Sequence, residues 1–307
     1  MSLFDNLTVG YEWETALLNE EFHMLDSKLL YKIITELRRE FPYSRTGTDG
    51  MWRMGDIIFE IRSGILRSFK EHEKKARVMT EKAHQLAKKY KAIFYPSSSL
   101  EIYGRPFGLH VHVGTITDPG LANLVANKFS KYAPALIALS ANSPVWKFKA
   151  GEFKSYRMSC NADWCSVPRR IVNPDFLYFS WGDDINVKFH YKPTVELRCG
   201  DTASSERFLI EYVALAALSL VIISETEKDF KVSRNEYFEN MVNRIQAFKY
   251  GLQAEFIIKG KKTTPGDLIL DLLKRGRTVL KRFGCSKNDF SLVLEMIKKR
   301  QTQSDFK

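Results

Sequence analysis

Cysteine is scarce in this chain, with 4 residues among 307, at positions 160, 165, 199 and 285. Cys160 and Cys165 stand five positions apart, but no second pair follows, and a structural zinc ion normally needs four ligands. We therefore expect buried or inert thiols rather than a zinc clip. So few cysteines also fit a cytoplasmic protein.

Long hydrophobic runs are also missing. The longest, Val213 to Ile223 (VALAALSLVII), is too short to span a bilayer and is flanked by Glu211 and Glu225. The first ten residues, MSLFDNLTVG, lack the basic and apolar regions of a secretory signal. The sequence therefore predicts no membrane-spanning segment and a cytoplasmic location.

Negative charge is in the minority. Asp and Glu number 36 against 47 Lys and Arg, which gives a formal net charge of +11, and basic runs occur at 70–91, 259–262 and 298–300. Such a surface attracts anions of several kinds, including nucleic acid, membrane surfaces and polyphosphates such as ATP. Because lysine-rich helical faces are often simply solvated, charge alone does not choose among these partners.

Apolar residues are plentiful enough for a sizeable core. They make up 44% of the chain, aromatic residues make up 13%, and no internal repeat or low-complexity linker is found. We expect a single domain over residues 1–307 with a mostly helical C-terminal third. Strands spread through the first two thirds, with helices gathered at the end, are typical of an α+β fold.

The periodicity of apolar residues and the capping signals predict the elements in order. A strand at 7–18 is followed by a helix that Asp26 or Ser27 caps and that runs through Phe41, before Pro42. Further predicted elements are a strand near 56–62, a basic helix at about 69–90, the strands AIFYP and GLHVHVG, a helix capped by Asp118 that ends near Tyr132, another from Pro134, and the strands INVKFH and TVELRCG.

Three predicted strands carry pairs of polar residues two positions apart. Residues i and i+2 of a strand share a face, so each pair points to one side while its apolar neighbours point to the other. Glu60 alternates in the same way within DIIFEIRSG. The pairs are Glu12 with Glu14, His110 with His112, and Glu196 with Arg198.

Taken singly, each pair has a simpler interpretation as solvent-facing alternation. Several carboxylates on one sheet face repel one another, however, and are collected chiefly where a cation neutralises them. Carboxylates with few imidazoles favour Mg²⁺ or Mn²⁺ over zinc, although a mononuclear zinc hydrolase remains an alternative. If the strands share a sheet, the sequence predicts a site for a divalent metal and phosphate.

These residues resemble a known family, the carboxylate-amine ligases of the bacterial gamma-glutamylcysteine ligase type, whose catalytic fold is similar to that of glutamine synthetase. The resemblance implies a curved, mainly antiparallel sheet, with one concave face that binds metal and ATP and with helices on the other face. The matching stretches occur in family order between residue 7 and about 252: LTVGYEWE, IIFEIRSG, GLHVHVG, YAPALIALSANSPVW with SYR, TVELRCGD and NRIQAFKYGL.

The resemblance also implies roles for individual residues. Glu12 and Glu14 would supply acids to two different metal ions, Glu60 would supply another acid, and His110 with Glu196 would complete the ion on the ATP phosphates. The other implied positions are His112 and Arg198 on phosphate oxygens, Arg157 on the transferred phosphate or the substrate carboxylate, Lys188 near the nucleotide, Asn142 and Ser143 in the pocket wall, and Arg244 and Tyr250 as weaker candidates. Arg198 and Arg157 would be the catalytic pair.

The chain departs from the family pattern in places. The family usually has an acidic residue seven positions before the one that matches Glu60. This chain has Arg53 there, and the nearest acid is Asp56. The metal ion on Glu14 and Glu60 would therefore have an altered set of ligands. Lys188 stands where many relatives have arginine, and lysine lacks the bidentate fork. Shortened segments before GLHVHVG and between Arg157 and Glu196 affect the region that defines the amino-acid pocket.

The resemblance implies an ATP-dependent ligase that joins a carboxylate to cysteine or another small amine through an acyl phosphate. The expected carboxylate substrate is glutamate, and the expected cofactors are ATP and Mg²⁺ (or Mn²⁺). A phosphotransferase of the same fold and a member that binds nucleotide without turnover are alternatives. A nucleic-acid-binding module is a third, but it leaves the four glutamates unexplained. We expect small-molecule substrates, no nucleic acid and no membrane partner, and leave homo-oligomerisation open.

Overall fold

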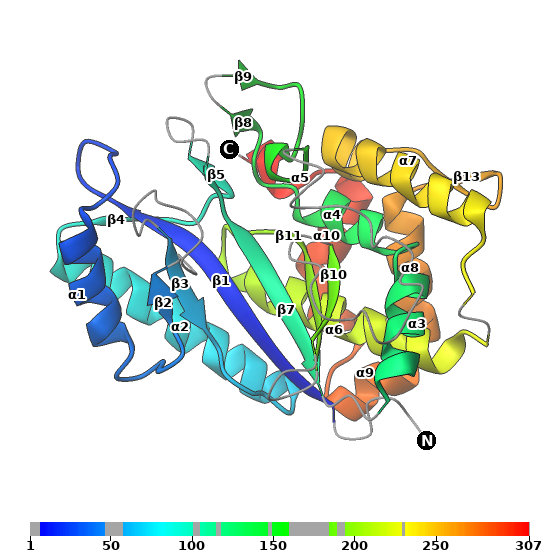
Figure 1. The fold of residues 1–307 in the computed structure, drawn as a ribbon, viewed down its shortest axis with the longest axis horizontal. Coiled ribbons are helices and arrows are strands. Elements are labelled where there is room, and N and C mark those ends of the chain that lie inside the picture. The colour runs from blue at the N-terminus through cyan, green and yellow to red at the C-terminus, as the bar shows by residue number, and fades with distance from the viewer. Residues whose placement is uncertain are drawn as a thin grey trace.

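The protein is described by a computed structural model that covers residues 7–46, 58–100, 105–114, 118–146, 149–159, 184–188, 194–228 and 231–306 (Figure 1). Four residues considered above lie outside this part of the chain, namely Arg53, Asp56, Cys160 and Cys165. The other two cysteines, Cys199 and Cys285, are free and buried, as expected.

A seven-stranded sheet forms the centre of the molecule, and every strand pair described in it is antiparallel. The order is β10-β11-β7-β1-β3-β2, and β4 also pairs with β1. The strands of the sheet are β1 (Thr8–Leu18), β2 (Arg45–Thr46), β3 (Phe59–Arg62), β4 (Ile93–Tyr95), β7 (Gly108–Gly114), β10 (Ile185–Lys188) and β11 (Thr194–Asp201). Three small hairpins pair β5 (Ser99–Leu100) with β6 (Arg105–Pro106), β8 (Val145–Trp146) with β9 (Lys149–Ala150), and β12 (Phe256–Ile258) with β13 (Lys261–Thr263).

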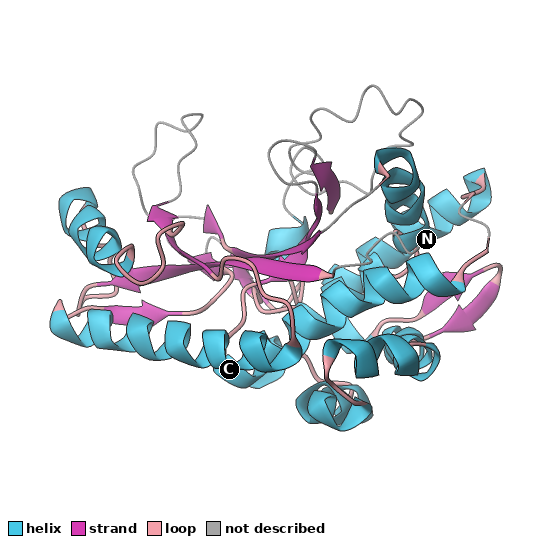
Figure 2. Cartoon of the chain, turned by 90° about the horizontal axis from the view of Figure 1, so that it is seen from below, coloured by secondary structure: helices cyan, strands magenta, loops and turns pink. Residues whose placement is uncertain are grey.

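Helices cover one face of this sheet, and others lie beyond its β10 edge or beside β2 at the opposite edge (Figures 1 and 2). They are α1 (Ser27–Leu37), α2 (Phe69–Lys89), α3 (Pro119–Phe129), α4 (Ala133–Ser140), α5 (Tyr156–Ser159), α6 (Glu206–Thr226), α7 (Arg234–Tyr250), α8 (Pro265–Arg275), α9 (Arg277–Phe283) and α10 (Ser291–Lys299). The α+β class expected from the sequence is therefore confirmed.

The core lies between the sheet and helices α2 and α6. Tyr11 and Trp13 of β1 are almost fully buried there, and the Tyr11 hydroxyl contacts the Met79 sulfur of α2 at 3.2 Å. Because neighbouring residues of a strand point to opposite faces, Glu12 and Glu14 must point to the face away from α2 and α6. The alternation in the sequence thus fixes which side of the sheet carries the polar groups.

Helix α6 is a long, strongly apolar helix. By length and composition it is the one helix among the described residues that could cross a membrane, but 89% of its most apolar window is buried inside the fold. Burial between the sheet and the C-terminal helices accounts for the apolar run that the sequence shows.

Most element boundaries agree with the sequence predictions. Asp26 caps α1 by accepting hydrogen bonds from the amides of Lys28 and Leu29, and Asp118 caps α3 with Pro119 at its first turn. One difference is that α1 ends at Leu37, four residues before the predicted end at Phe41. The amides of Arg39 and Glu40 bond three residues back, so the helix tightens into turns before Pro42, which disfavours helical backbone in the preceding residue.

Candidate active site

The register of four strands places the predicted polar residues in rows across the open face of the sheet. In one row, Arg62 of β3 lies opposite Glu12 of β1, which lies opposite His110 of β7. In the next row, His112 of β7 lies opposite Glu196 of β11. The sequence could not show which strands are neighbours, and the register supplies this information.

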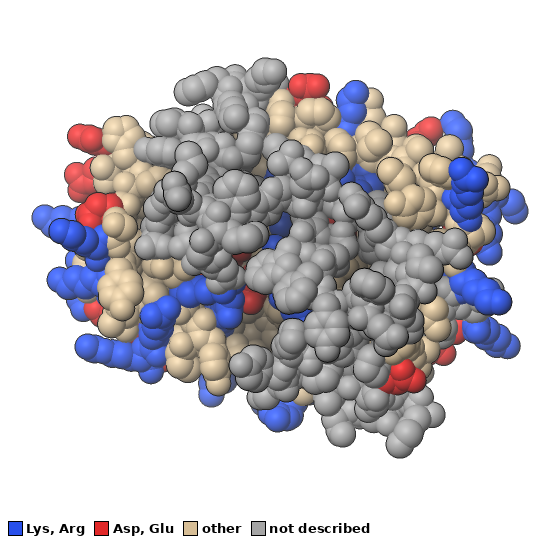
Figure 3. Space-filling model, in the orientation of Figure 1, with Lys and Arg blue, Asp and Glu red and all other residues tan. Residues whose placement is uncertain are grey.

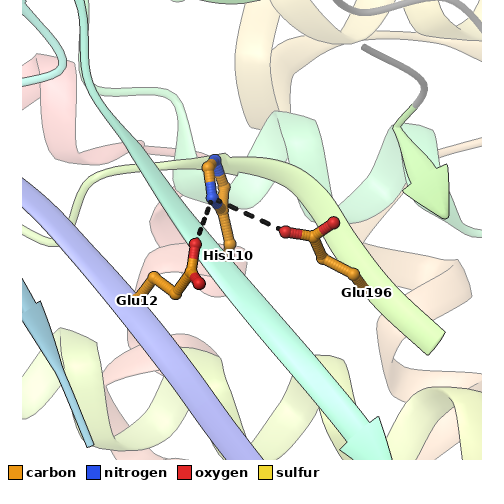
Figure 4. Close-up of side chains that lie close together, drawn as sticks. All are labelled: Glu12, His110 and Glu196. Atoms are coloured by element: carbon orange, nitrogen blue, oxygen red, sulfur yellow. Dashed lines mark hydrogen bonds and ion pairs between the residues drawn. The ribbon is translucent and has the colours of Figure 1, made fainter. Parts of the chain in front are cut away.

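Glu12, His110 and Glu196 form the centre of the site (Figure 4). The His110 Nδ1 atom lies 3.2 Å from Glu12 Oε2 and 3.8 Å from Glu196 Oε1. One ligand atom from each of the three residues lies within 4.8 Å of the others, and all three side chains are largely buried. The spatial convergence that the sequence analysis required is therefore present.

His112 extends this centre towards β11. Its Nε2 atom lies 3.6 Å from Glu12 Oε1 and 3.6 Å from Glu196 Oε1, and it is buried without a hydrogen-bond partner among the described residues. Two cationic side chains also reach Glu196, with Lys188 Nζ at 2.8 Å and Arg198 Nη1 at 3.3 Å. The predicted metal and phosphate residues thus border one another.

The protonation states of this centre suit cation binding. Burial opposes ionisation of Glu12, but the hydrogen bond to His110, the neighbouring His112 ring and the charge of Arg62 outweigh it, and the pKa of Glu12 lies well below its usual range. Burial likewise opposes ionisation of Glu196, yet the positive charge of Arg198, the neighbouring His112 ring and the positive charge of Lys188 lower its pKa to about 2. Burial and then the charge of Arg198 lower the pKa of His110, which favours the neutral imidazole that a metal requires.

Glu14 and Glu60 lie beside this centre but outside the group of three. They are opposite each other on β1 and β3. The Glu14 Oε2 atom accepts a hydrogen bond from the Gly108 amide at 2.7 Å, and Glu14 Oε1 lies 3.9 Å from His110 Nδ1. Glu60 is bound by the guanidinium groups of Arg45 and Arg62. Burial and the negative charge of Glu12 raise the pKa of Glu60 to about 7, because these arginines only partly offset the crowding of acids.

Arg157 lies against the start of β7 and is almost fully buried. Its Nη2 atom donates to the carbonyl oxygen of Arg198 at 3.0 Å, and its Nη1 atom lies 3.8 Å from a carboxylate oxygen of Asp201. A Cβ atom on Gly108 would lie 2.8 Å from His110 Nε2 and closer still to Arg157 Nη2. The close approach of these two side chains therefore depends on a glycine at position 108.

Asn142 and Ser143, predicted to shape the pocket wall, bind a buried acid behind the site. The Asn142 backbone N–H and the Ser143 hydroxyl donate to Asp201 Oδ2 at 2.8 and 2.9 Å, and the Ser155 hydroxyl donates to Asp201 Oδ1 at 3.0 Å. The Ser143 hydroxyl oxygen also accepts from the Arg157 amide at 3.1 Å. This hydrogen-bond network holds the backbone of Arg157 in place.

The two weaker candidates on α7 have different surroundings. Arg244 donates to both carboxylate oxygens of Asp184, at 2.7 and 3.2 Å, and the carbonyl oxygen of Asp184 accepts from the Arg198 amide at 2.8 Å. Arg244 therefore contacts the loop before β10, which in turn holds the backbone of Arg198. Tyr250, at the end of α7, is 42% exposed.

The donor set fits one hard divalent cation. Ligands about 2.1 Å from an octahedral ion lie roughly 3 to 4 Å apart, which is the spacing of His110 Nδ1 from the two carboxylates. The orphaned His112 Nε2 faces the same point. Two carboxylates with one imidazole favour Mg²⁺ or Mn²⁺, and such an ion would neutralise phosphate oxygens. The metal role of these residues stays a prediction.

The sequence analysis missed the basic partners of the acids, above all Arg62 and Arg45. Arg62 stands two positions after Glu60 in FEIR, so the alternation rule used for the other pairs places it on the same face. Figure 3 shows this side of the molecule, where lysines and arginines line much of the rim and acidic and basic atoms are visible near the centre.

Solved structures first define the class of fold. A bifunctional glutathione synthetase from Pasteurella multocida matches with a TM-score of 0.67 at 14% identity, over 98% of this chain and 49% of that chain. The glutamate–cysteine ligase from Francisella tularensis, solved in complex with AMP, matches with a TM-score of 0.60 at 13% identity, over 98% of this chain and 84% of that chain. This chain therefore has the α+β fold of these ligases.

Sequence relatives then show which family the chain resembles. The model named "Glutamate-cysteine ligase family 2(GCS2)" matches residues 90–183. A provisionally named glutamate–cysteine ligase 2 of Solibacter usitatus is 29% identical over 68% of this chain and 60% of its own length, and the glutamate–cysteine ligase of Haloquadratum walsbyi is 31% identical over 51% and 48%. Over these stretches the chain is similar to the glutamate–cysteine ligase family. It spans about half to three fifths of the length of these relatives.

Proposed function

We propose that this protein is an ATP-dependent carboxylate-amine ligase that activates the γ-carboxylate of glutamate as an acyl phosphate and joins it to cysteine or another small amine. The convergence of Glu12, His110 and Glu196 on the open face of the sheet carries the proposal, because it supplies a cation site beside basic residues. The sequence similarity to the glutamate–cysteine ligase family and the shared fold support the reaction class.

The described residues would contribute mainly positioning and electrostatic stabilisation. A carboxylate is a poor electrophile until its oxygen becomes a phosphate leaving group. Arg198, with 21% of its side chain exposed, would stabilise charge on the transferred phosphoryl group, and Lys188 would do so from the edge strand. Mg²⁺ bound to Glu12, His110 and Glu196 would neutralise the phosphate oxygens of ATP. Arg157, turned towards Asp201, would act from beside His110 at the start of β7.

The small-molecule partners and the cytoplasmic location belong to the same proposal. Acids on the sheet face would repel nucleic-acid phosphates unless metal were bound. Glutamate is the substrate that the family name suggests, whereas the residues that would select it include segments outside the described chain.

The test is an assay with purified full chain, Mg²⁺, ATP, glutamate and cysteine, in which joined product is identified by mass spectrometry and phosphate release is timed. Glu196→Gln should lower the rate on the order of a thousand-fold, because a lost metal contact removes several kcal/mol of transition-state stabilisation. Glu295→Gln, on the exposed face of α10, is the matched control and should keep the wild-type rate.

Other results would favour the alternatives. A phosphorylated acceptor without a joined product would indicate a phosphotransferase of this fold. Retained nucleotide binding without turnover across a panel of amino acids and amines would indicate a degenerate family member. An unaltered rate in Glu196→Gln would refute the metal role of Glu196.

A further inference from the structure

The side of Glu12 that faces away from His110 is already occupied by a cationic side chain. The Arg62 Nη2 atom lies 2.9 Å from Glu12 Oε1, while Glu12 Oε2 faces His110. The Arg62 Nε atom also donates to Glu60 Oε1. One guanidinium group therefore bridges the two acidic strands at the place where the family resemblance implies a second metal ion.

This bridge follows from strand register as well as from side-chain rotamers. Arg62 lies directly opposite Glu12, Glu60 lies directly opposite Glu14, and Arg45 of β2 lies directly opposite Glu60. The Arg45 Nε atom lies 3.0 and 3.1 Å from the two oxygens of Glu60, whose side chain is only 1% exposed. A planar guanidinium has several N–H donors whose arrangement matches the two oxygens of a carboxylate. Such a contact therefore has a better defined geometry than one made by a lysine.

We propose that Arg62, supported by Arg45, is a built-in cation that replaces the second divalent ion at Glu14 and Glu60. The nucleotide-free protein then holds a single ion, on Glu12, His110 and Glu196. This inference rests on the proposed function, since it assumes that this group of three binds a metal. It also revises the role that the resemblance assigns to Glu60.

The ligand requirements of a divalent cation support the replacement. Mg²⁺ and Mn²⁺ need oxygen ligands at about 2.1 Å from the ion. Both oxygens of Glu60 already bind guanidinium groups, and Glu14 Oε2 accepts a hydrogen bond from the Gly108 amide. A second ion would also sit against the positive charge of Arg62. Removing the Arg62 guanidinium would leave Arg45, which contacts Glu60, as the remaining described guanidinium against Glu12, Glu14 and Glu60.

The experiment counts Mn²⁺ ions bound to the nucleotide-free full chain, by the loss of the free Mn²⁺ paramagnetic resonance signal on titration. We expect one ion in the wild type, two in Arg62→Ala, and one again in the double variant Arg62→Ala/Glu60→Gln. Arg67→Ala removes an exposed arginine outside the site and should leave one ion. Arg62→Lys keeps the positive charge and should also leave one bound ion. This variant is less prone to misfold than Arg62→Ala.

Two results would overturn the inference. One is a second ion in the wild type that Glu60→Gln removes, and the other is a single ion in a folded Arg62→Ala variant. Failure of the proposed function is distinguishable, because Glu196→Gln would then leave the first ion bound. If neither the wild type nor Arg62→Ala binds Mn²⁺, both proposals are overturned.

Discussion

Gly108 stands at the first position of β7, where the side chains of Arg157 and His110 come together over its Cα atom. Its amide also donates to Glu14, so the residue touches the acidic group from the backbone side. At this scale the site depends on the absence of a side chain as much as on the charged residues.

We predict that Gly108→Ala displaces Arg157 or His110, because the added methyl group would overlap both. Mn²⁺ affinity should fall about tenfold, as for other disturbances of groups that orient a ligand. The free energy of unfolding should fall by about 1 to 3 kcal/mol. Titration of Mn²⁺ and urea unfolding measure the two effects.

Gly120→Ala is the matched control for this prediction. Gly120 lies in the first turn of α3, and its nearest neighbour for an added Cβ is Asp118 Oδ1 at 3.4 Å. This variant should leave Mn²⁺ affinity unchanged. Equal effects of the two substitutions would show that Gly108 has no special role.

At the scale of elements, the contact between α2 and α6 includes a buried histidine. The His72 Nε2 atom lies 2.9 Å from the Ile210 carbonyl oxygen, and the ring packs edge-on against Tyr11 of β1. Burial lowers the pKa of His72 to about 4. The histidine is therefore neutral in the folded protein across the physiological range.

This burial predicts that stability falls in mild acid. The unfolded histidine titrates near 6.5 and the folded one near 4, so both states are neutral above pH 6.5 and the contribution is fully present. Between these values only the unfolded state takes up the proton, and the free energy of unfolding should fall by up to about 3 kcal/mol by pH 4. Urea unfolding at a series of pH values measures this loss.

Substitution isolates the contribution of His72 from that of other titrating groups. His72→Gln keeps a donor for the Ile210 carbonyl oxygen and should flatten the stability profile between pH 4 and 6.5. His23→Gln changes an exposed histidine and should leave the slope as in the wild type. Identical slopes in all three proteins would contradict the prediction.

At the scale of the whole molecule, α6 connects the N-terminal and C-terminal parts. It packs against β7, α2 and α3 as well as α8, α9 and α10. The Trp13 Nε1 atom of β1 donates to the Ala203 carbonyl oxygen, and Glu211 of α6 accepts the amides of Leu292 and Val293. We propose that residues 1–307 form one domain rather than two.

A single domain predicts one cooperative unfolding transition. Tryptophan fluorescence and far-ultraviolet circular dichroism should report the same urea midpoint, and the calorimetric and van't Hoff enthalpies should agree. Mn²⁺ should move the whole transition to higher temperature, since it binds only the folded state. Two separated transitions, with only one sensitive to Mn²⁺, would argue for two domains.

The sequence by itself determined the local features of this protein. The alternation of β1, β7 and β11 set which side chains share a face, and caps such as Asp26 and Asp118 set where helices begin. Both depend on periodicity and hydrogen bonding within a few residues, which a single chain displays directly. The α+β class and the candidate metal residues followed from these features and from the family resemblance.

Only the tertiary structure decided which strands are neighbours and in what register. That pairing joins residues as distant as Glu12 and Glu196, and it depends on long-range packing that no local pattern encodes. It also placed Arg62 between Glu12 and Glu60, and it set Asp201 behind Arg157. The set of acids could be predicted from the sequence, whereas the cation already paired with each acid could not, because ion pairing depends on distances in space.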